Sequence, residues 1–201
     1  MERFLFIWVE GGSDARLFEA VFKPLFEKKY RRVEIRTYAN LKREAFQKIL
    51  LGMQSMEADF IVVADIDQEP CITSKKKYVQ TRIKGIEDEW IRVVIQEIES
   101  WYLAGVNESS ASLLGLPFLN RTDTVTKEQF IAMMPEQYDS RIDFMMEILK
   151  TFSIKTAMEK NDSFRYFVSK HKLEFVHAGN FQELKNSRSS EIRLKIAKHE
   201  S

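Results

Sequence analysis

Three apolar stretches with the composition of buried strands constrain this chain most, because acidic residues follow or end each of them. The first is Phe4–Val9, which is followed by Glu10, and the others are Asp59–Asp67 and Trp90–Ser100. An apolar run without polar alternation is typical of a strand that is covered on both faces, as in a parallel sheet. The chain is therefore predicted to contain a sheet whose strands end in carboxylates.

Helical patterns separate these strands. Gly11 and Gly12 interrupt the first apolar run, and Ser13 is a suitable N-cap for a helix that begins at Asp14. A shorter and more polar strand is expected at Val33–Tyr38. Apolar residues at helical spacing precede and follow that strand: Leu17, Phe18, Val21, Phe22, Leu25 and Phe26, then Leu41, Ala45, Phe46, Ile49, Leu50 and Met53.

Strands that alternate with helices predict an α/β fold. We expect an open, mostly parallel four-stranded sheet with helices on both faces over residues 1–110. No strong strand pattern returns after Gly105, so residues 111–201 are expected to form a C-terminal helical annex packed on this domain. The tail from Lys185 onward is expected to be a solvated helix or a frayed end. The annex prediction rests on a capping residue, Thr126, and on apolar stripes: Phe130, Met133 and Met134; Ile142, Met145, Met146 and Leu149; Phe164, Phe167 and Val168.

Composition excludes several classes of protein. The 201 residues carry a formal net charge of +1, so the chain as a whole is not a polycation that coats nucleic acid. A single cysteine, Cys71, excludes an internal disulfide framework and fits a reducing compartment. The N-terminal apolar run of about seven residues is too short for a signal-peptide core or a membrane span. We expect a soluble, cytoplasmic protein without a membrane partner.

Acidic residues at the three strand ends form the candidate site. In open α/β sheets, ligands bind beyond the carboxyl ends of the strands, where loops from distant parts of the sequence converge. Carboxylates crowded there would raise one another's pKa values unless a cation lay between them, and Mg²⁺ prefers such oxygen ligands. Asp65 and Asp67 are two residues apart, so on a strand they would point to the same side. Their alternative role is that of ordinary turn formers and helix caps. The candidates are Glu10, Asp14, Asp65, Asp67, Glu97 and Glu99.

Two of these motifs together resemble a known domain. "VEGGSD" at Val9–Asp14 and "ADID" at Ala64–Asp67 resemble the signature of the Toprim domain, which occurs in topoisomerases, bacterial primases, small ribosomal-RNA maturation nucleases and OLD-family nucleases. "IESWYLAG" at Ile98–Gly105 is similar to a segment of small stand-alone Toprim-like proteins related to the OLD group. The resemblance covers roughly residues 1–110 and implies a Toprim-like sheet. The annex resembles no family.

The resemblance also implies roles for the acidic residues. Glu10 matches the catalytic glutamate, which acts as general acid or base. Asp65 and Asp67 match the metal-binding pair, for Mg²⁺ or Mn²⁺. Gln68, Glu69 and Pro70 follow this pair where the family often has a third aspartate or a glycine, so the number of metal ions stays open. Asp14 and Glu99 also match acidic metal-binding positions of the family, and Glu97 is a weaker match beside Glu99.

The implied function is metal-dependent hydrolysis of phosphodiester bonds in DNA or RNA, and the OLD resemblance implies a separate ATPase that acts in defence or repair. Topoisomerase activity would need a large DNA gate, and primase activity usually needs a zinc module that a one-cysteine chain cannot build. No phosphate-loop motif or nucleophile elbow occurs, so no built-in ATPase or serine hydrolase is expected. Two alternatives stay open. One is a Toprim-like protein that binds a metal or partner without catalysis, and the other is a Mg²⁺-dependent phosphatase or nucleotidyl-transfer enzyme.

A basic segment, Ser74–Gly85, follows the second acidic strand end. Its cations would hold phosphates beside a metal site, and Tyr78 would stack on a base, although a solvated helix face is the alternative. Lys155 and Lys160 are further candidates for stabilising phosphate charge. The remaining assignments are structural: Trp90 and Trp101 in the core, His171 and His177 at the surface, and Cys71 inert. The five predicted nucleic-acid-binding residues are Lys75, Lys76, Lys77, Arg82 and Lys84.

Overall fold

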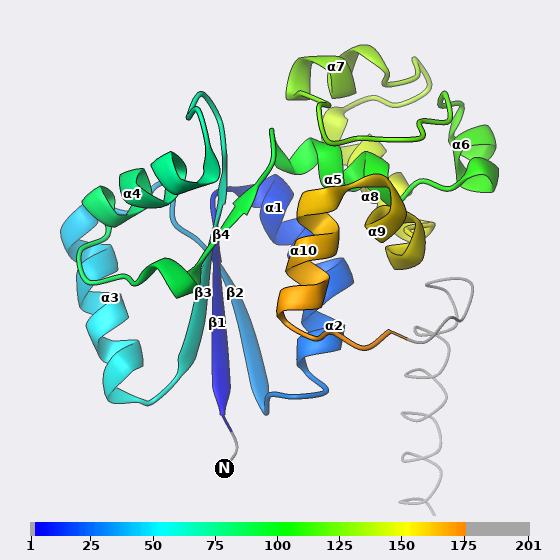
Figure 1. Cartoon of the computed structure of the whole chain (residues 1–201). Coiled ribbons are helices and arrows are strands. Elements are labelled where there is room, and N and C mark those ends of the chain that lie inside the picture. The colour runs from blue at the N-terminus through cyan, green and yellow to red at the C-terminus, as the bar shows by residue number, and fades with distance from the viewer. Residues whose placement is uncertain (1–2, 176–201) are drawn as a thin grey trace, which may run out of the picture.

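The computed structural model describes residues 3–175 and contains a four-stranded parallel sheet (Figure 1). The strands lie in the order β2-β1-β3-β4. Central strands β1 and β3 are apolar because helices cover both of their faces. The predicted α/β class is therefore confirmed. The strand bounds are β1 Phe4–Val9, β2 Arg32–Thr37, β3 Asp59–Asp65 and β4 Ile91–Val94.

One face of the sheet is covered by α3 (Arg43–Ser55) and α4 (Ile72–Arg82). Every second residue of β1 and β3 points to this face, where Trp8 and Val62 pack against Phe46 of α3. A short 3₁₀ helix, η2 (Asp88–Trp90), leads into β4, and its Trp90 stacks on Phe60 at 5.0 Å between ring centroids. The hydrophobic core of this face is separate from that of the other face.

The opposite face is covered by the helical segment after β1 and by helices from the second half of the chain (Figure 1). The first segment consists of α1 (Gly12–Leu17), the π-helical turn η1 (Phe18–Phe22) and α2 (Lys23–Phe26). Aromatic rings bind the two halves together, since Phe22 packs against Trp101 at 5.7 Å and Phe167 at 4.7 Å. The later helices are α5 Ile98–Ala104, α6 Glu108–Leu114, α7 Lys127–Ala132, α8 Arg141–Lys150, α9 Ile154–Lys160 and α10 Asp162–Lys170.

All described elements after Gly105 are helices, as the sequence predicts. Their core is continuous with that of the sheet, because one buried cluster contains Ile7 of β1, Trp101 of α5, Phe144 of α8 and Phe164 of α10. The described helices after Gly105 thus share a hydrophobic core with the sheet. The division at residue 110 remains a prediction.

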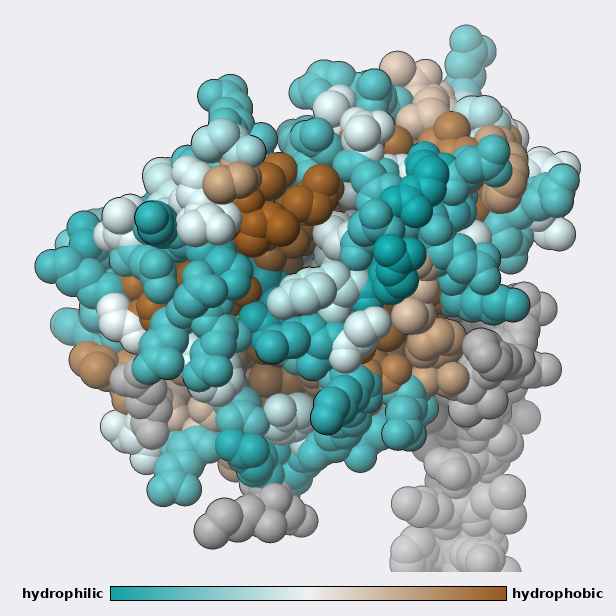
Figure 2. All heavy atoms as spheres, viewed as in Figure 1, coloured by the Kyte–Doolittle hydropathy of each residue, from teal (hydrophilic) through white to brown (hydrophobic). Residues whose placement is uncertain are grey.

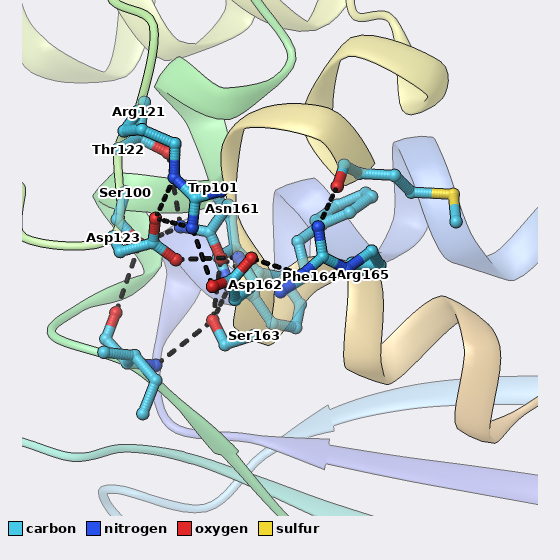
Figure 3. A network of polar contacts seen from close by, with 12 residues as sticks. Ser100, Trp101, Arg121, Thr122, Asp123, Asn161, Asp162, Ser163, Phe164 and Arg165 are labelled. Carbon is cyan, nitrogen blue, oxygen red and sulfur yellow. Dashed lines mark hydrogen bonds and ion pairs between the residues drawn. The ribbon is translucent and has the colours of Figure 1, made fainter.

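A buried network of hydrogen bonds connects the end of β4 to α5 and α10 (Figure 3). Ser163 accepts a 2.7 Å hydrogen bond from the indole N–H of Trp101 and a 3.3 Å bond from the backbone N–H of Ile95. The Asn161 side chain accepts from Ser163 and from the backbone N–H of Phe164, and donates to Thr122. Because α5 is held by this network, the residues at its first turn have a fixed position relative to the sheet.

Three sequence expectations, about the start of the first helix, the length of β4 and the burial of His171, are wrong. The first helix begins at Gly12 with Gly11 as its N-cap, not at Asp14 with Ser13, because the Asp14 carboxylate accepts the backbone N–H of Gly11 at 3.1 Å. The third acidic run is not a long strand: β4 ends at Val94, and Glu97 is the N-cap of α5. Glu97 and Glu99 therefore do not belong to a strand end; they lie at the start of α5.

The third error concerns His171, which is partly buried rather than on the surface. Its Nε2 accepts a 3.0 Å hydrogen bond from Arg92, and its ring packs 4.7 Å from that of Phe167. Burial, followed by the charge of Arg92, lowers the pKa of His171 to about 3. His177 and the tail from Lys185 lie outside the described residues. Within the described part of the chain, no helix has the length and apolar character needed to cross a membrane.

Candidate functional site at the carboxyl ends of the strands

The site lies where the direction of the chain's crossovers reverses. From β1 the chain passes outward to β2, and from β3 it passes outward in the opposite direction to β4. Loops diverge at such a point, and ligands of open α/β sheets bind there. Glu10 follows β1 and Asp65 ends β3, so the two carboxylates come from the adjacent strands that flank the reversal.

Asp14 and Asp65 each have a buried oxygen without a partner. The Oδ1 atoms of both residues lack solvent contact and lack a hydrogen bond within the described structure. Asp14 is only 5% exposed, and its other oxygen accepts the Gly11 N–H. A buried carboxylate is normally fully hydrogen-bonded or paired with a cation. The Oδ1 atom of each aspartate could therefore still accept a hydrogen bond or bind a cation.

The pKa values of these carboxylates are raised by burial first and then by the charges of their acidic neighbours. Burial, opposed by backbone hydrogen bonds and aided by the charges of Glu10 and Glu99, raises the pKa of Asp14 to about 6. Burial raises the pKa of Asp65 well above its ordinary value, and the charges of Asp14 and Glu10 raise it further. Burial and the charge of Asp67 also raise the pKa of Glu10. Glu10, Asp14 and Asp65 thus lie on separate segments and influence one another's charges; they are called the carboxylate group below.

Asp67 has a different environment from its predicted partner Asp65. β3 ends at Asp65, and Asp67 lies beyond it in a turn with a left-handed backbone (φ 52°). The expectation that the two point to one side of a strand is therefore wrong. Asp67 forms a short ion pair with Lys75, which is only 4% exposed. Lys75 therefore neutralises Asp67 in this structure, and the charge of Asp67 still reaches Glu10.

Glu99 and Glu97 lie at the start of α5. Glu99 is 3% exposed and pairs with Arg141 of α8 at 3.0 Å. Burial raises the pKa of Glu99, while its own backbone N–H and then Arg141 oppose the shift. Glu97 accepts the backbone N–H of Lys127 at 2.5 Å, at the N-terminus of α7. Glu99 thus belongs to the carboxylate group, because its charge reaches Asp14. Glu97 instead connects the start of α5 to the start of α7.

Two contributors to the site escaped the sequence reasoning. Tyr38 follows β2, and its hydroxyl donates to the Val63 carbonyl at 3.1 Å. Burial and then the charges of Glu10 and the neighbouring aspartates raise the pKa of Tyr38 well above its ordinary value. Its place at the end of a strand beside β1 was a usable signal. The sequence contained no such signal for Arg141, because only the folding of the annex brings α8 close to α5.

A divalent cation fits the chemistry of Asp14 and Asp65. Their donors are hard oxygens and are partly unsatisfied, and burial followed by nearby negative charge raises their pKa values. In the side-chain positions described here, no group of three His, Cys, Asp or Glu residues forms a metal site. Asp67 and Glu99 would join such a set only after release from Lys75 and Arg141.

A cleft of about 440 Å³ opens beside the carboxylates. Glu10 and Asp67 line its acidic end. α3 and α4 form its other walls, which carry Arg43, Tyr78 and Arg82. Figure 2 shows hydrophilic side chains over most of the visible face and a hydrophobic patch between α4 and the annex.

The predicted basic segment is divided by this cleft. Most of it lies in α4, which ends at Arg82, and only Lys75 and Arg82 of the five predicted residues line the cleft. Lys76 pairs with Asp88 at 2.7 Å, and Lys77 and Lys84 are exposed outside the cleft lining.

The two lysines of the annex are placed differently from each other. Lys160 is buried and donates to the backbone carbonyls of Leu103 and Val106, which is a structural role. Lys155 is exposed. Of the aromatic residues predicted for the core, Trp101 is fully buried and Trp90 is partly buried. Cys71 is exposed.

Comparisons with known proteins find similarity at the level of structure. No protein-family model and no curated protein matches the chain. Among solved structures, the chain is similar to the C-terminal region of the Burkholderia pseudomallei OLD protein, with 13% sequence identity, coverage of 85% of this chain and 98% of that chain, and a TM-score of 0.49. The assignment of a function therefore depends on the residues of this chain.

Proposed function

We propose that this protein is a divalent-metal-dependent nuclease of Toprim type that hydrolyses phosphodiester bonds in DNA or RNA. The observation that carries the proposal is the pair of unpartnered, buried carboxylate oxygens of Asp14 and Asp65 at the reversal point of the sheet. Unpaired buried charge is costly, so its retention at a ligand-binding position favours a cationic ligand. The resemblance of "VEGGSD" and "ADID" to the Toprim signature supports the same function.

The environment of each residue suggests its role in the reaction. Asp14 and Asp65, which retain free oxygens, would hold Mg²⁺ or Mn²⁺, and Glu99 and Asp67 would contribute after losing their cationic partners. When bound, the metal would polarise the phosphoryl oxygen and lower the pKa of the attacking water. Glu10 is half-buried directly after β1, and burial followed by the charge of Asp67 raises its pKa, which suits a group that exchanges protons.

The reaction is hydrolysis. The oxygen of water forms a bond to phosphorus, the bond from phosphorus to the sugar oxygen breaks, and the departing oxygen receives a proton. Glu10 would transfer a proton in this step, for which a positioned group contributes about 10²–10⁴-fold in rate. The OLD resemblance further suggests a separate ATPase partner, which binding to a purified ATPase subunit would test.

Cleavage of supercoiled plasmid DNA and of a folded RNA, with Mg²⁺ or Mn²⁺, tests the proposal. The natural chain should cut at least one of them, and Asp65→Asn should reduce the rate by about a hundredfold or more. Asp139→Asn is the matched control, because Asp139 is exposed and is not one of the predicted site residues. No metal-dependent cleavage by the natural chain, or equal rates for Asp65→Asn, would contradict the proposal.

A second candidate is a Toprim-like protein that binds a metal or a partner without catalysis. The ion pairs Asp67–Lys75 and Glu99–Arg141 favour it, because they already neutralise two of the carboxylates. Metal binding that depends on Asp65, combined with no cleavage of DNA or RNA, would support this candidate over the nuclease.

A further inference from the structure

The cleft beside the carboxylates contains two arginines that form no ion pair within the described residues, although the charge of Arg82 reaches Glu10. Arg43 of α3 and Arg82 of α4 line it, and neither forms an ion pair within residues 3–175. Both are exposed, so they are available to a ligand. By contrast, Lys75 already pairs with Asp67. The open side of the cleft is therefore suited to an anionic group.

Apolar and aromatic side chains line the same cleft as these cations. Tyr78 is 44% exposed, although a large ring on a helix facing a core is usually buried. The Lys75 ammonium lies 5.5 Å from the centroid of its ring. Because α4 presents this ring in the cleft together with Arg82, a flat group bound there would have a stacking surface and an adjacent cation.

The size of the cleft limits its occupant. A volume of about 440 Å³ lies at the lower end of the roughly 300–1,000 Å³ that is usual for small-ligand pockets. A volume of this order is suited to a single nucleotide. A base within a duplex would have to leave its stack to enter, at a cost of a few kcal/mol.

We propose that this cleft binds one unstacked nucleotide of a single-stranded nucleic acid, with the base against Tyr78, the phosphate beside Arg82 and Arg43, and the adjoining phosphodiester at Glu10. The inference rests on the proposed function, and it adds that the substrate is single-stranded or has an unpaired region at the cleavage site. Glu10 lines both the cleft and the carboxylate group, and this shared residue connects binding to hydrolysis.

Binding of fluorescent oligonucleotides to the full chain tests the inference separately from cleavage. The Asp65→Asn chain is used with Mg²⁺, and the natural chain is used in EDTA, so that the probe stays intact. A 12-nucleotide single strand, as DNA and as RNA, is compared with its duplex at one fixed salt concentration. We expect the single strand to bind about tenfold or more tightly than the duplex.

Single substitutions locate the binding. Tyr78→Ala and Arg82→Ala should each weaken single-strand binding by about five- to tenfold or more, whereas Tyr78→Phe, which keeps the ring, should retain it. Lys48→Ala is the matched control, because Lys48 is an exposed cation of α3 outside the cleft lining. Thermal melting of each variant checks that the fold is intact.

The outcomes distinguish this inference from the nuclease proposal. Equal binding of single strand and duplex, or unchanged binding in both Tyr78→Ala and Arg82→Ala, would overturn the inference even if the natural chain cleaves nucleic acid. A single-strand preference that depends on Tyr78, without any metal-dependent cleavage, would support the cleft and overturn the nuclease proposal alone. A difference between the DNA and RNA probes identifies the sugar.

Discussion

Two buried polar regions of this molecule are built in opposite ways. In the network between α5 and α10, the side chain of Asn161 accepts two hydrogen bonds and donates to Ser100 and Thr122. In the carboxylate group at the strand ends, Asp14 and Asp65 each keep an oxygen without a partner. The first region is complete within the protein, and the second is not.

The difference separates a structural role from a functional one. A saturated buried network stabilises one arrangement of the chain, and removing a member leaves its partners unsatisfied. An unsaturated acidic group destabilises the chain by itself, so it persists where a ligand supplies the missing interaction. Substitutions in the two regions should therefore change stability in opposite directions.

The largest effect is expected for Asn161→Ala. The substitution removes the N-cap of α10 and leaves buried donors of Ser163 and Phe164 without their acceptor, so unfolding should become easier by about 3–4 kcal/mol. Chemical denaturation followed by circular dichroism measures this. Asn107→Ala is the control: Asn107 caps α6 in a less buried position, and its loss should cost about 1 kcal/mol. Equal costs for the two asparagines would contradict the role given to the network.

A smaller effect of opposite sign is expected for Asp14→Asn without metal. Asparagine keeps an oxygen that accepts the Gly11 N–H, but it removes a buried charge from the carboxylate group. At pH 7.5 the metal-free variant should be more stable than the natural chain by about 1–3 kcal/mol, since one pKa unit corresponds to about 1.4 kcal/mol. Melting in EDTA measures the gain, with Asp139→Asn as a neutral control. A loss of stability would show that Asp14 is a structural residue like Asn161.

The pH dependence should sharpen this result. The folded pKa of Asp14, about 6, lies above its ordinary value of 3.8, so the folded chain binds the proton more tightly than the unfolded chain. The resulting stabilisation is fully present below about pH 4 and is lost as the pH rises through 6. The stability difference between Asp14→Asn and the natural chain should therefore shrink from pH 7.5 to pH 5.

The same pH experiment has a second, opposing contribution. His171 has a pKa lowered to about 3, so its burial destabilises the fold as the pH falls below about 6.5. This contribution is common to both chains and cancels in their difference. A difference that stays constant between pH 5 and pH 7.5 would contradict a raised pKa at Asp14.

Much of the sheet could be predicted from the sequence, because strands covered on both faces need continuous apolar runs. Phe4–Val9 was placed correctly for this reason. The end of β4 was placed wrongly, because the apolar pattern continues through Ile98 into α5. The buried face of α5 also needs apolar residues. Apolar periodicity alone does not separate a buried strand from the buried first turn of a helix.

The candidate site was predictable only where the sheet itself positions the residue. Glu10 and Asp65 follow directly from the strand ends, so a local motif locates them. The partners of the other acidic residues depend on tertiary packing: Lys75 reaches Asp67 from α4, and Arg141 reaches Glu99 from the annex. Arg43 lines the cleft because α3 packs on the sheet beside α4, and its local sequence contains no signal for this.

The most direct test of the central claim is calorimetric titration of Mn²⁺ into the natural chain and into Asp65→Asn. If the unpartnered carboxylate oxygens exist to hold a cation, the natural chain and the Asp139→Asn control should bind Mn²⁺ with the same affinity. Asp65→Asn should then show no detectable binding while it keeps its fold. Absence of binding by the natural chain, or equal binding by Asp65→Asn, would contradict the claim.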